Sequence, residues 1–167
     1  MENVSHCNLC EHKQYDFSTG NLCGLTQKKA DFIKKCSKIM LANNAKEQIA
    51  KINLEYEEIK ARKVDVIGHL ILFSIFGAVI IIADIYFTKY LLEAGWISTA
   101  SIVGIAIGLS LIGYGFAPFV NYRETIGTAK SQKDRLDNIL KIYDYGYDIN
   151  FENEDYLTAV TLRRVKQ

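Results

Sequence analysis

Proline and histidine are scarce in this sequence, and two long stretches of it are almost free of charged residues. It contains one proline, Pro118, and three histidines in 167 residues. A chain with so little proline and no Ser/Pro/Gly-rich tract lacks the composition of long disordered linkers, so we expect continuous, mostly helical segments. No P-loop, GxGxxG, HExxH or nucleophile-elbow motif occurs, and three histidines leave little material for acid–base chemistry. We therefore expect the protein not to be an enzyme.

Two stretches are almost free of charge. The first lies between Asp65 and Asp84 and the second between Glu93 and Arg123. About 18 apolar residues at 1.5 Å per residue cross a hydrocarbon layer about 30 Å thick. The second stretch is longer than this, so its helix must tilt, kink near Pro118 or protrude into the headgroups. We predict transmembrane helices at 66–90 and 96–122, joined by an outer turn at 91–95.

The distribution of lysine and arginine predicts the orientation. Of the 20 cations, 11 precede the first span, one lies between the spans and eight follow the second. Cationic segments next to a span stay on the cytoplasmic side. The expected protein is therefore multi-pass, with a lipid bilayer as its partner and both termini in the cytoplasm. Acids are interleaved with the cations at both ends, so nucleic-acid binding is not expected.

Four cysteines stand near the N-terminus in the pattern C-x2-C-x12-C-x12-C. They are Cys7, Cys10, Cys23 and Cys36. Four thiolates complete a closed tetrahedral zinc site, and a segment this short needs a metal to fold. Residues 13–21 alternate and then turn, which predicts a hairpin carrying the first three ligands. Disulfides are the main alternative and are disfavoured in a reducing compartment; a redox CxxC is less favoured still. His6 and His12 are alternative ligands, but we expect them at the surface.

The order CNLC, NLCGLTQKKADF and KKC resembles the N-terminal cysteine segment of various small, uncharacterised bacterial membrane proteins. The resemblance covers roughly residues 7–36 and rests on the four cysteines and on Gly24-Leu25-Thr26 after the third. It implies a bacterial inner-membrane location and metal binding at Cys7, Cys10, Cys23 and Cys36. It implies no catalytic activity.

Apolar residues recur at steps of three and four on both cytoplasmic sides of the spans. Before the first span they run from Ala45 to Ile59, and after the second from Tyr122 to Tyr143. Each set predicts a helix with one apolar seam. We expect the two helices to pair as a stalk, within one chain or between copies. Residues 144–148 break the helix, and 151–166 suit either a short helix or a strand.

The predicted fold class is mainly α. It is a two-helix transmembrane hairpin with a cytoplasmic helical stalk and a small N-terminal zinc-ribbon-like module. In chain order the predicted segments are a four-cysteine module (1–40), an amphipathic helix (41–65), the first span (66–90), the outer turn (91–95), the second span (96–122), a cytoplasmic helix (123–144) and a tail (145–167).

Two features of the spans are candidate functional sites. A carboxylate within a span is costly and commonly marks an ion path or a proton relay, but Asp84 lies about 28 Å along its helix, near the outer interface. Ala100, Gly104 and Gly108 place small residues at every fourth position of the second span, which lets helix backbones approach closely. Their partner is either Ser74 and Ala78 of the same chain or another copy in a homo-oligomer.

These patterns favour a non-enzymatic membrane adaptor or effector that self-associates and recognises a cytoplasmic protein through a module stabilised by structural zinc. One alternative is a subunit of an oligomeric channel or transporter that uses Asp84. Another is a metal or thiol redox sensor.

Overall fold

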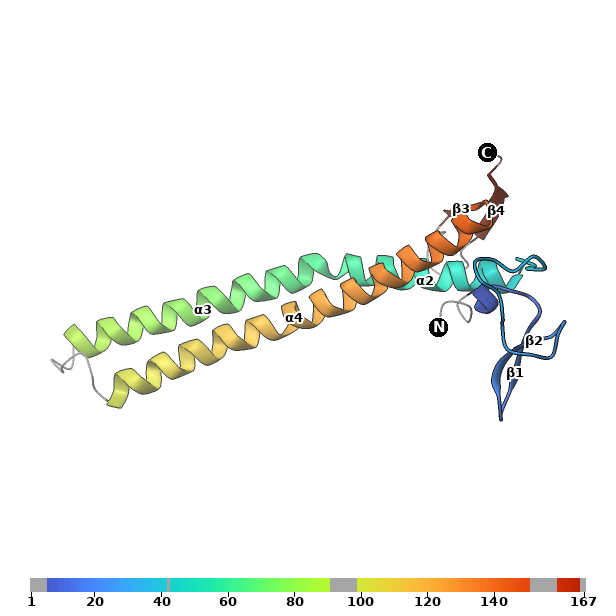
Figure 1. Ribbon diagram of the computed structural model, residues 1–167. Helices are drawn as coiled ribbons and strands as arrows, with labels where there is room; N and C mark the ends of the chain where they lie inside the picture. The colour runs from blue at the N-terminus through green and yellow to red at the C-terminus, as the bar shows by residue number, and fades with distance from the viewer. Residues whose placement is uncertain (1–5, 42, 91–98, 151–158, 166–167) are drawn as a thin grey trace. The chain divides into compact units, whose positions relative to one another are not determined.

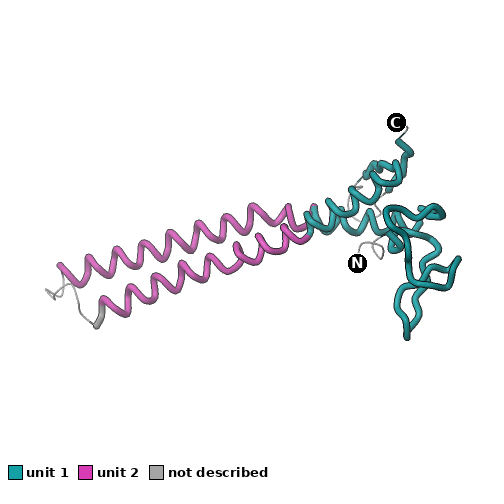
Figure 2. The backbone as a smooth tube through the Cα atoms, in the orientation of Figure 1, with its two compact units in different colours: residues 1–56, 129–167 teal, residues 57–128 magenta. Residues whose placement is uncertain are grey.

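The computed structural model describes residues 6–41, 43–90, 99–150 and 159–165, and the chain divides into two compact units. One unit holds residues 1–56 and 129–167, and the other holds residues 57–128 (Figure 2). The expected outer turn at 91–95 and residues 151–158 of the tail lie outside the described residues. The chain is mainly helical, as predicted, with two short hairpins (Figure 1).

The hairpin expected near the N-terminus is confirmed. Strand β1 (Lys13–Asp16) pairs antiparallel with β2 (Gly20–Cys23), with Lys13 opposite Cys23. The Asp16 carboxylate accepts the backbone N–H groups of Ser18 and Thr19 at 2.8 and 2.9 Å, which closes the turn. Gly20 follows at φ +82°, a conformation that costs glycine little. The hairpin thereby delivers Cys23 back beside the start of β1.

Helices α2 (Asn43–Ala61) and α3 (Lys63–Tyr90) follow each other with one residue between them. Helix α4 (Thr99–Ile142) continues through Pro118 and joins the second predicted span to the helix expected after it. Asn43–Tyr90 and Ser101–Ile142 are long and apolar enough to cross a membrane. Only 6% and 11% of their apolar windows is buried, whereas the core helix of a soluble protein is mostly buried. These two helices are compatible with a membrane hairpin.

The tail, for which the sequence left helix and strand open, forms a strand where the structure describes it. Strand β3 (Tyr145–Asn150) pairs antiparallel with β4 (Ala159–Arg164), with Ile149 opposite Val160. Asp144, at φ +59°, lies between the end of α4 and β3, and its carbonyl accepts the N–H of Val165 at 2.8 Å. The left-handed residue ends the helix and reverses the chain.

The first unit has one hydrophobic core, built from segments far apart in the sequence. Leu9 contributes from the cysteine segment and Val160 from β4, while α2 and the last part of α4 supply most of the rest. The expected apolar seams of the two helices meet there within one chain. The buried core residues are Leu9, Ala45, Ile49, Leu136, Ile139, Leu140, Tyr143 and Val160.

Candidate functional site

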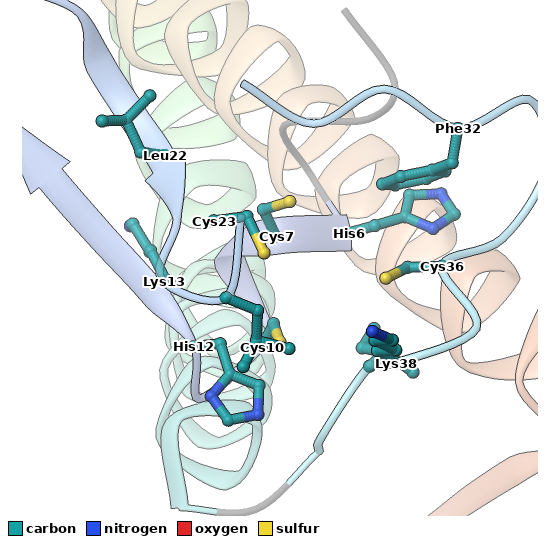
Figure 3. A pocket seen from close by; sticks show the side chains of 12 residues that line it. His6, Cys7, Cys10, His12, Lys13, Leu22, Cys23, Phe32, Cys36 and Lys38 are labelled. Atoms are coloured by element: carbon teal, nitrogen blue, oxygen red, sulfur yellow. The ribbon is translucent and has the colours of Figure 1, made fainter. Parts of the chain in front are cut away.

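The four cysteines line a single small cavity, which we call the cysteine pocket (Figure 3). Cys7 and Cys10 come from the turn that opens the described chain, Cys23 ends β2, and Cys36 lies in the irregular segment between β2 and α2. The cavity has a volume of about 20 Å³, which is room for one water molecule or ion. All four cysteines are free thiols, so the disulfide alternative finds no support in this geometry.

Local hydrogen bonds fix the turns that carry these sulfurs. The N–H of Cys10 donates to the Cys7 carbonyl at 3.1 Å, and the Asn44 side chain donates to the Cys10 carbonyl at 3.1 Å. The N–H of Gly24 donates to the His12 carbonyl at 2.7 Å. A Cβ at Gly24 would lie 3.0 Å from that carbonyl oxygen, so the close approach of these segments requires glycine. The first three cysteines are thus held by backbone geometry.

The electrostatics of the pocket differ between its thiols. Burial raises the pKa of the Cys7 thiol, and the neighbouring Cys10, Cys23 and Cys36 raise it further, while Lys13 opposes them. By contrast, the backbone N–H of Leu25 lowers the pKa of Cys23, and the hydroxyl and N–H of Thr26 add to that effect against a desolvation penalty. Hydrogen bonds from N–H groups to sulfur are the outer-shell contacts that stabilise a metal-bound thiolate.

Four cysteine thiols are a donor set that suits zinc, but their sulfurs are not arranged as metal ligands in this structure. Within the described ranges, no group of three or more His, Cys, Asp or Glu side chains has the arrangement of a metal site. All four cysteines nevertheless line one small cavity, and N–H groups donate hydrogen bonds to the sulfur of Cys23. These are the residues that would hold zinc, and zinc would supply cross-linking of the segment rather than reactivity.

The structure changes the prediction for His6, which lines the pocket, and adds Tyr143, which contacts His6 and the backbone of Cys36. His6 was expected at the surface, and this is wrong: its exposed fraction is 6%, because its ring packs against Phe32 and Tyr143 at centroid distances of 5.4 and 5.5 Å. His12 is half-buried. Tyr143 was recognised as the last apolar position of its helix, but nothing in the sequence connected it with cysteines more than 100 residues away.

In the second unit, Gly104 and Gly108 pack against α3 of the same chain. A Cβ at Gly104 would meet the carboxylate of Asp84, and one at Gly108 would lie 2.8 Å from the carbonyl oxygen of Gly77. We call the contact of Gly77, Asp84, Gly104 and Gly108 the helix seam. The nearest atoms of α3 to these two glycines belong to Gly77, Ile81 and Asp84, and the predicted partners Ser74 and Ala78 are not among them. Ala100 lies in the first turn of α4.

Several polar atoms of α3 are buried along the same side. His69 Nε2, Asp84 Oδ2 and Thr88 Oγ1 have no hydrogen-bond partner among the residues that the structure describes. His69 stacks on Phe73 at 4.4 Å, and Phe73 contacts Tyr114 of α4 at 5.1 Å. Asp84 thus faces the neighbouring helix, a direction that the sequence did not determine.

No protein-family model, curated protein or solved structure matches this chain.

Proposed function

We propose that the protein is a non-enzymatic membrane adaptor whose cytoplasmic unit is stabilised by zinc bound to Cys7, Cys10, Cys23 and Cys36. The observation that supports this proposal is that all four cysteines line one small cavity. In this proposal, α3 and the first part of α4 cross the bilayer of a bacterial inner membrane. Both termini lie in the cytoplasm, as the 11, one and eight cations before, between and after the spans favour.

An adaptor needs a surface for its partner, and the cysteine segment offers one. Tyr15 and Phe17, at the turn of the β1–β2 hairpin, are 68% and 99% exposed, with ring centroids 5.7 Å apart. Exposed aromatic side chains are the residue types enriched at the centres of protein interfaces. This pair supports recognition of a cytoplasmic protein. Self-association in the membrane must use faces of α3 and α4 other than the helix seam, which is already filled within one chain.

The test of the zinc proposal is the metal content of the full-length protein purified in detergent without chelators. We expect one zinc per chain and four thiols protected from alkylation until the metal is removed. Cys10→Ser should lower the zinc content, because a three-sulfur site is incomplete. Ser37→Ala is a control outside the ligand set. A chain that is free of zinc and reacts at all four thiols would remove the proposal.

The alternative of a channel or transporter subunit has one specific observation in its favour. Within the described residues, the buried side-chain atoms of His69, Asp84 and Thr88 have no hydrogen-bond partner, and ionisable groups such as His69 and Asp84 within a span commonly belong to ion or proton paths. If Asp84 carries ions, Asp84→Asn should change the ion or proton flux of proteoliposomes at least several-fold. Equal flux through the wild-type protein and Asp84→Asn would contradict an ion path through Asp84 and favour the adaptor. Reversible loss of metal in cells would instead favour the sensor.

A further inference from the structure

Cys36 stands apart from the tight turn and the strand that carry the other three cysteines of the pocket. Cys7 and Cys10 share a tight turn and Cys23 ends a strand, whereas residues 29–41 around Cys36 form neither helix nor strand. Fixing an irregular segment costs conformational entropy at each of its residues. A fourth ligand in such a segment therefore needs a contact from elsewhere in the fold to keep it at the pocket.

The contact comes from the tyrosine that follows α4. The backbone N–H of Cys36 donates to the hydroxyl oxygen of Tyr143 at 2.9 Å. The same oxygen lies 2.9 Å from Nδ1 of His6, the residue beside Cys7, in a buried hydrogen bond. One hydroxyl group thus joins the segments of the first and fourth cysteines, and Figure 3 shows His6 and Cys36 at the same side of the pocket.

Tyr143 itself is firmly held. It belongs to the hydrophobic core and is 8% exposed. Its N–H donates to the Leu140 carbonyl at 3.1 Å, and the left-handed Asp144 then turns the chain into β3. A hydroxyl held in this way is a fixed point against which the ligand in the irregular segment can be positioned, as outer-shell partners do in metal sites.

We infer that Tyr143 is the positioning residue of the cysteine pocket, and that it makes metal binding and the order of the C-terminal end of α4 depend on each other. This inference rests on the proposed function, because it requires a metal at the four cysteines. Its second part follows from linkage: if an ordered Tyr143 tightens metal binding, bound metal orders Tyr143 by the same factor.

The experiment uses full-length protein in detergent and compares Tyr143→Phe with Tyr145→Phe. The first variant keeps the aromatic ring of residue 143 and loses only its hydroxyl. The matched control removes the hydroxyl of Tyr145, the first residue of β3. We expect Tyr143→Phe to weaken zinc binding about 10- to 100-fold in competition with a chromophoric chelator, the range usual for outer-shell partners. The control should bind zinc like the wild type.

Two further measurements separate positioning from general stability. Zinc should slow hydrogen exchange at the Cys36 amide and at the end of α4 in the wild type, and this effect should be lost in Tyr143→Phe. Cobalt substitution should show sulfur-to-metal bands of four thiolates in the wild type and weaker bands in the variant. If Tyr143→Phe does not fold, His6→Phe, which removes the other hydrogen bond, is expected to weaken zinc binding in the same direction.

The outcomes are distinguishable. Wild-type protein that binds no zinc would overturn both the proposed function and this inference. Zinc bound to the wild type with the same affinity, cobalt spectrum and exchange pattern in Tyr143→Phe would overturn the inference alone and leave the zinc site standing.

Discussion

At the scale of residues, a part-buried polar network joins β3, α4 and α2 in the first unit. Tyr147 of β3 donates its hydroxyl proton to the Asp137 carboxylate at 2.6 Å and accepts from the Asn53 amide at 3.3 Å. Asn53 is 2% exposed on α2 and also donates to the Ile49 carbonyl at 2.9 Å. An asparagine on the apolar face of a helix is explained only by such partners, since a buried amide without them is costly.

Tyr147→Phe should therefore destabilise the first unit. The change leaves Asp137 and one donor of Asn53 without their partner, and we expect a loss of about 1–3 kcal/mol. Thermal unfolding of the full chain in detergent, followed by near-ultraviolet circular dichroism, measures it. Tyr145→Phe serves as the control, and equal melting of the two variants would contradict the assignment.

The same residue should make stability depend on alkaline pH. Burial, followed by the Asp137 carboxylate, raises the pKa of Tyr147 to about 12 from the usual value of about 10. A raised pKa means that the folded state favours the neutral phenol. Its contribution is complete below pH 10 and is lost as pH rises from about 10 to about 12. Tyr147→Phe should lack this part of the decline, which a pH series of melting curves would show.

At the scale of elements, the helix seam fixes the separation of α3 and the first part of α4. Gly108→Leu should push the two helices apart, because its Cβ would lie 2.8 Å from the carbonyl oxygen of Gly77. Overpacking of this kind costs about 1–3 kcal/mol. Gly113→Leu is a matched control on α4, since a Cβ there meets no atom within 4 Å. Melting in detergent should fall for Gly108→Leu only, and equal melting would contradict the seam.

The sequence predicted where helices and strands lie along the chain better than it predicted which side of each helix faces its neighbour. The hairpin of residues 13–23 and the apolar positions Ala45, Ile49 and Leu140 were predictable, because turn residues and helical periodicity are local signals. The side of α3 that faces α4 was not, since a helix that is apolar all round presents no preferred face. The sequence of residues 159–164 did not distinguish helix from strand either, because the strand depends on pairing with Tyr145–Asn150.

At the scale of the whole molecule, segments that the sequence analysis treated separately pack around one hydrophobic core. The cysteine segment, the helix before the spans, the helix after them and the tail were distinguished as separate stretches, and the structure gathers them around one core. Periodicity detects an apolar face but not its partner. The role of Tyr143 depends on this long-range meeting, and that is why the candidate ligands were predictable and the residue that positions one of them was not.

The proposed topology predicts which thiols are reachable from outside the cell. A cysteine introduced as Ala94→Cys, in the predicted outer turn, should react with a membrane-impermeant maleimide on intact cells. The wild-type chain, whose four cysteines all precede the first span, should react only after lysis and metal removal. Labelling of the wild-type protein on intact cells would contradict cytoplasmic termini.

The core that unites Leu9 with Val160 also sets an order of events during synthesis. A ribosome reaches β4 only after it has made both apolar helices. On the proposed topology, insertion into the bilayer therefore comes first and the cytoplasmic unit closes afterwards. The cysteine segment is translated before the elements that it packs against, so it meets the cell's metal and thiol pools before the rest of its fold exists to shield it.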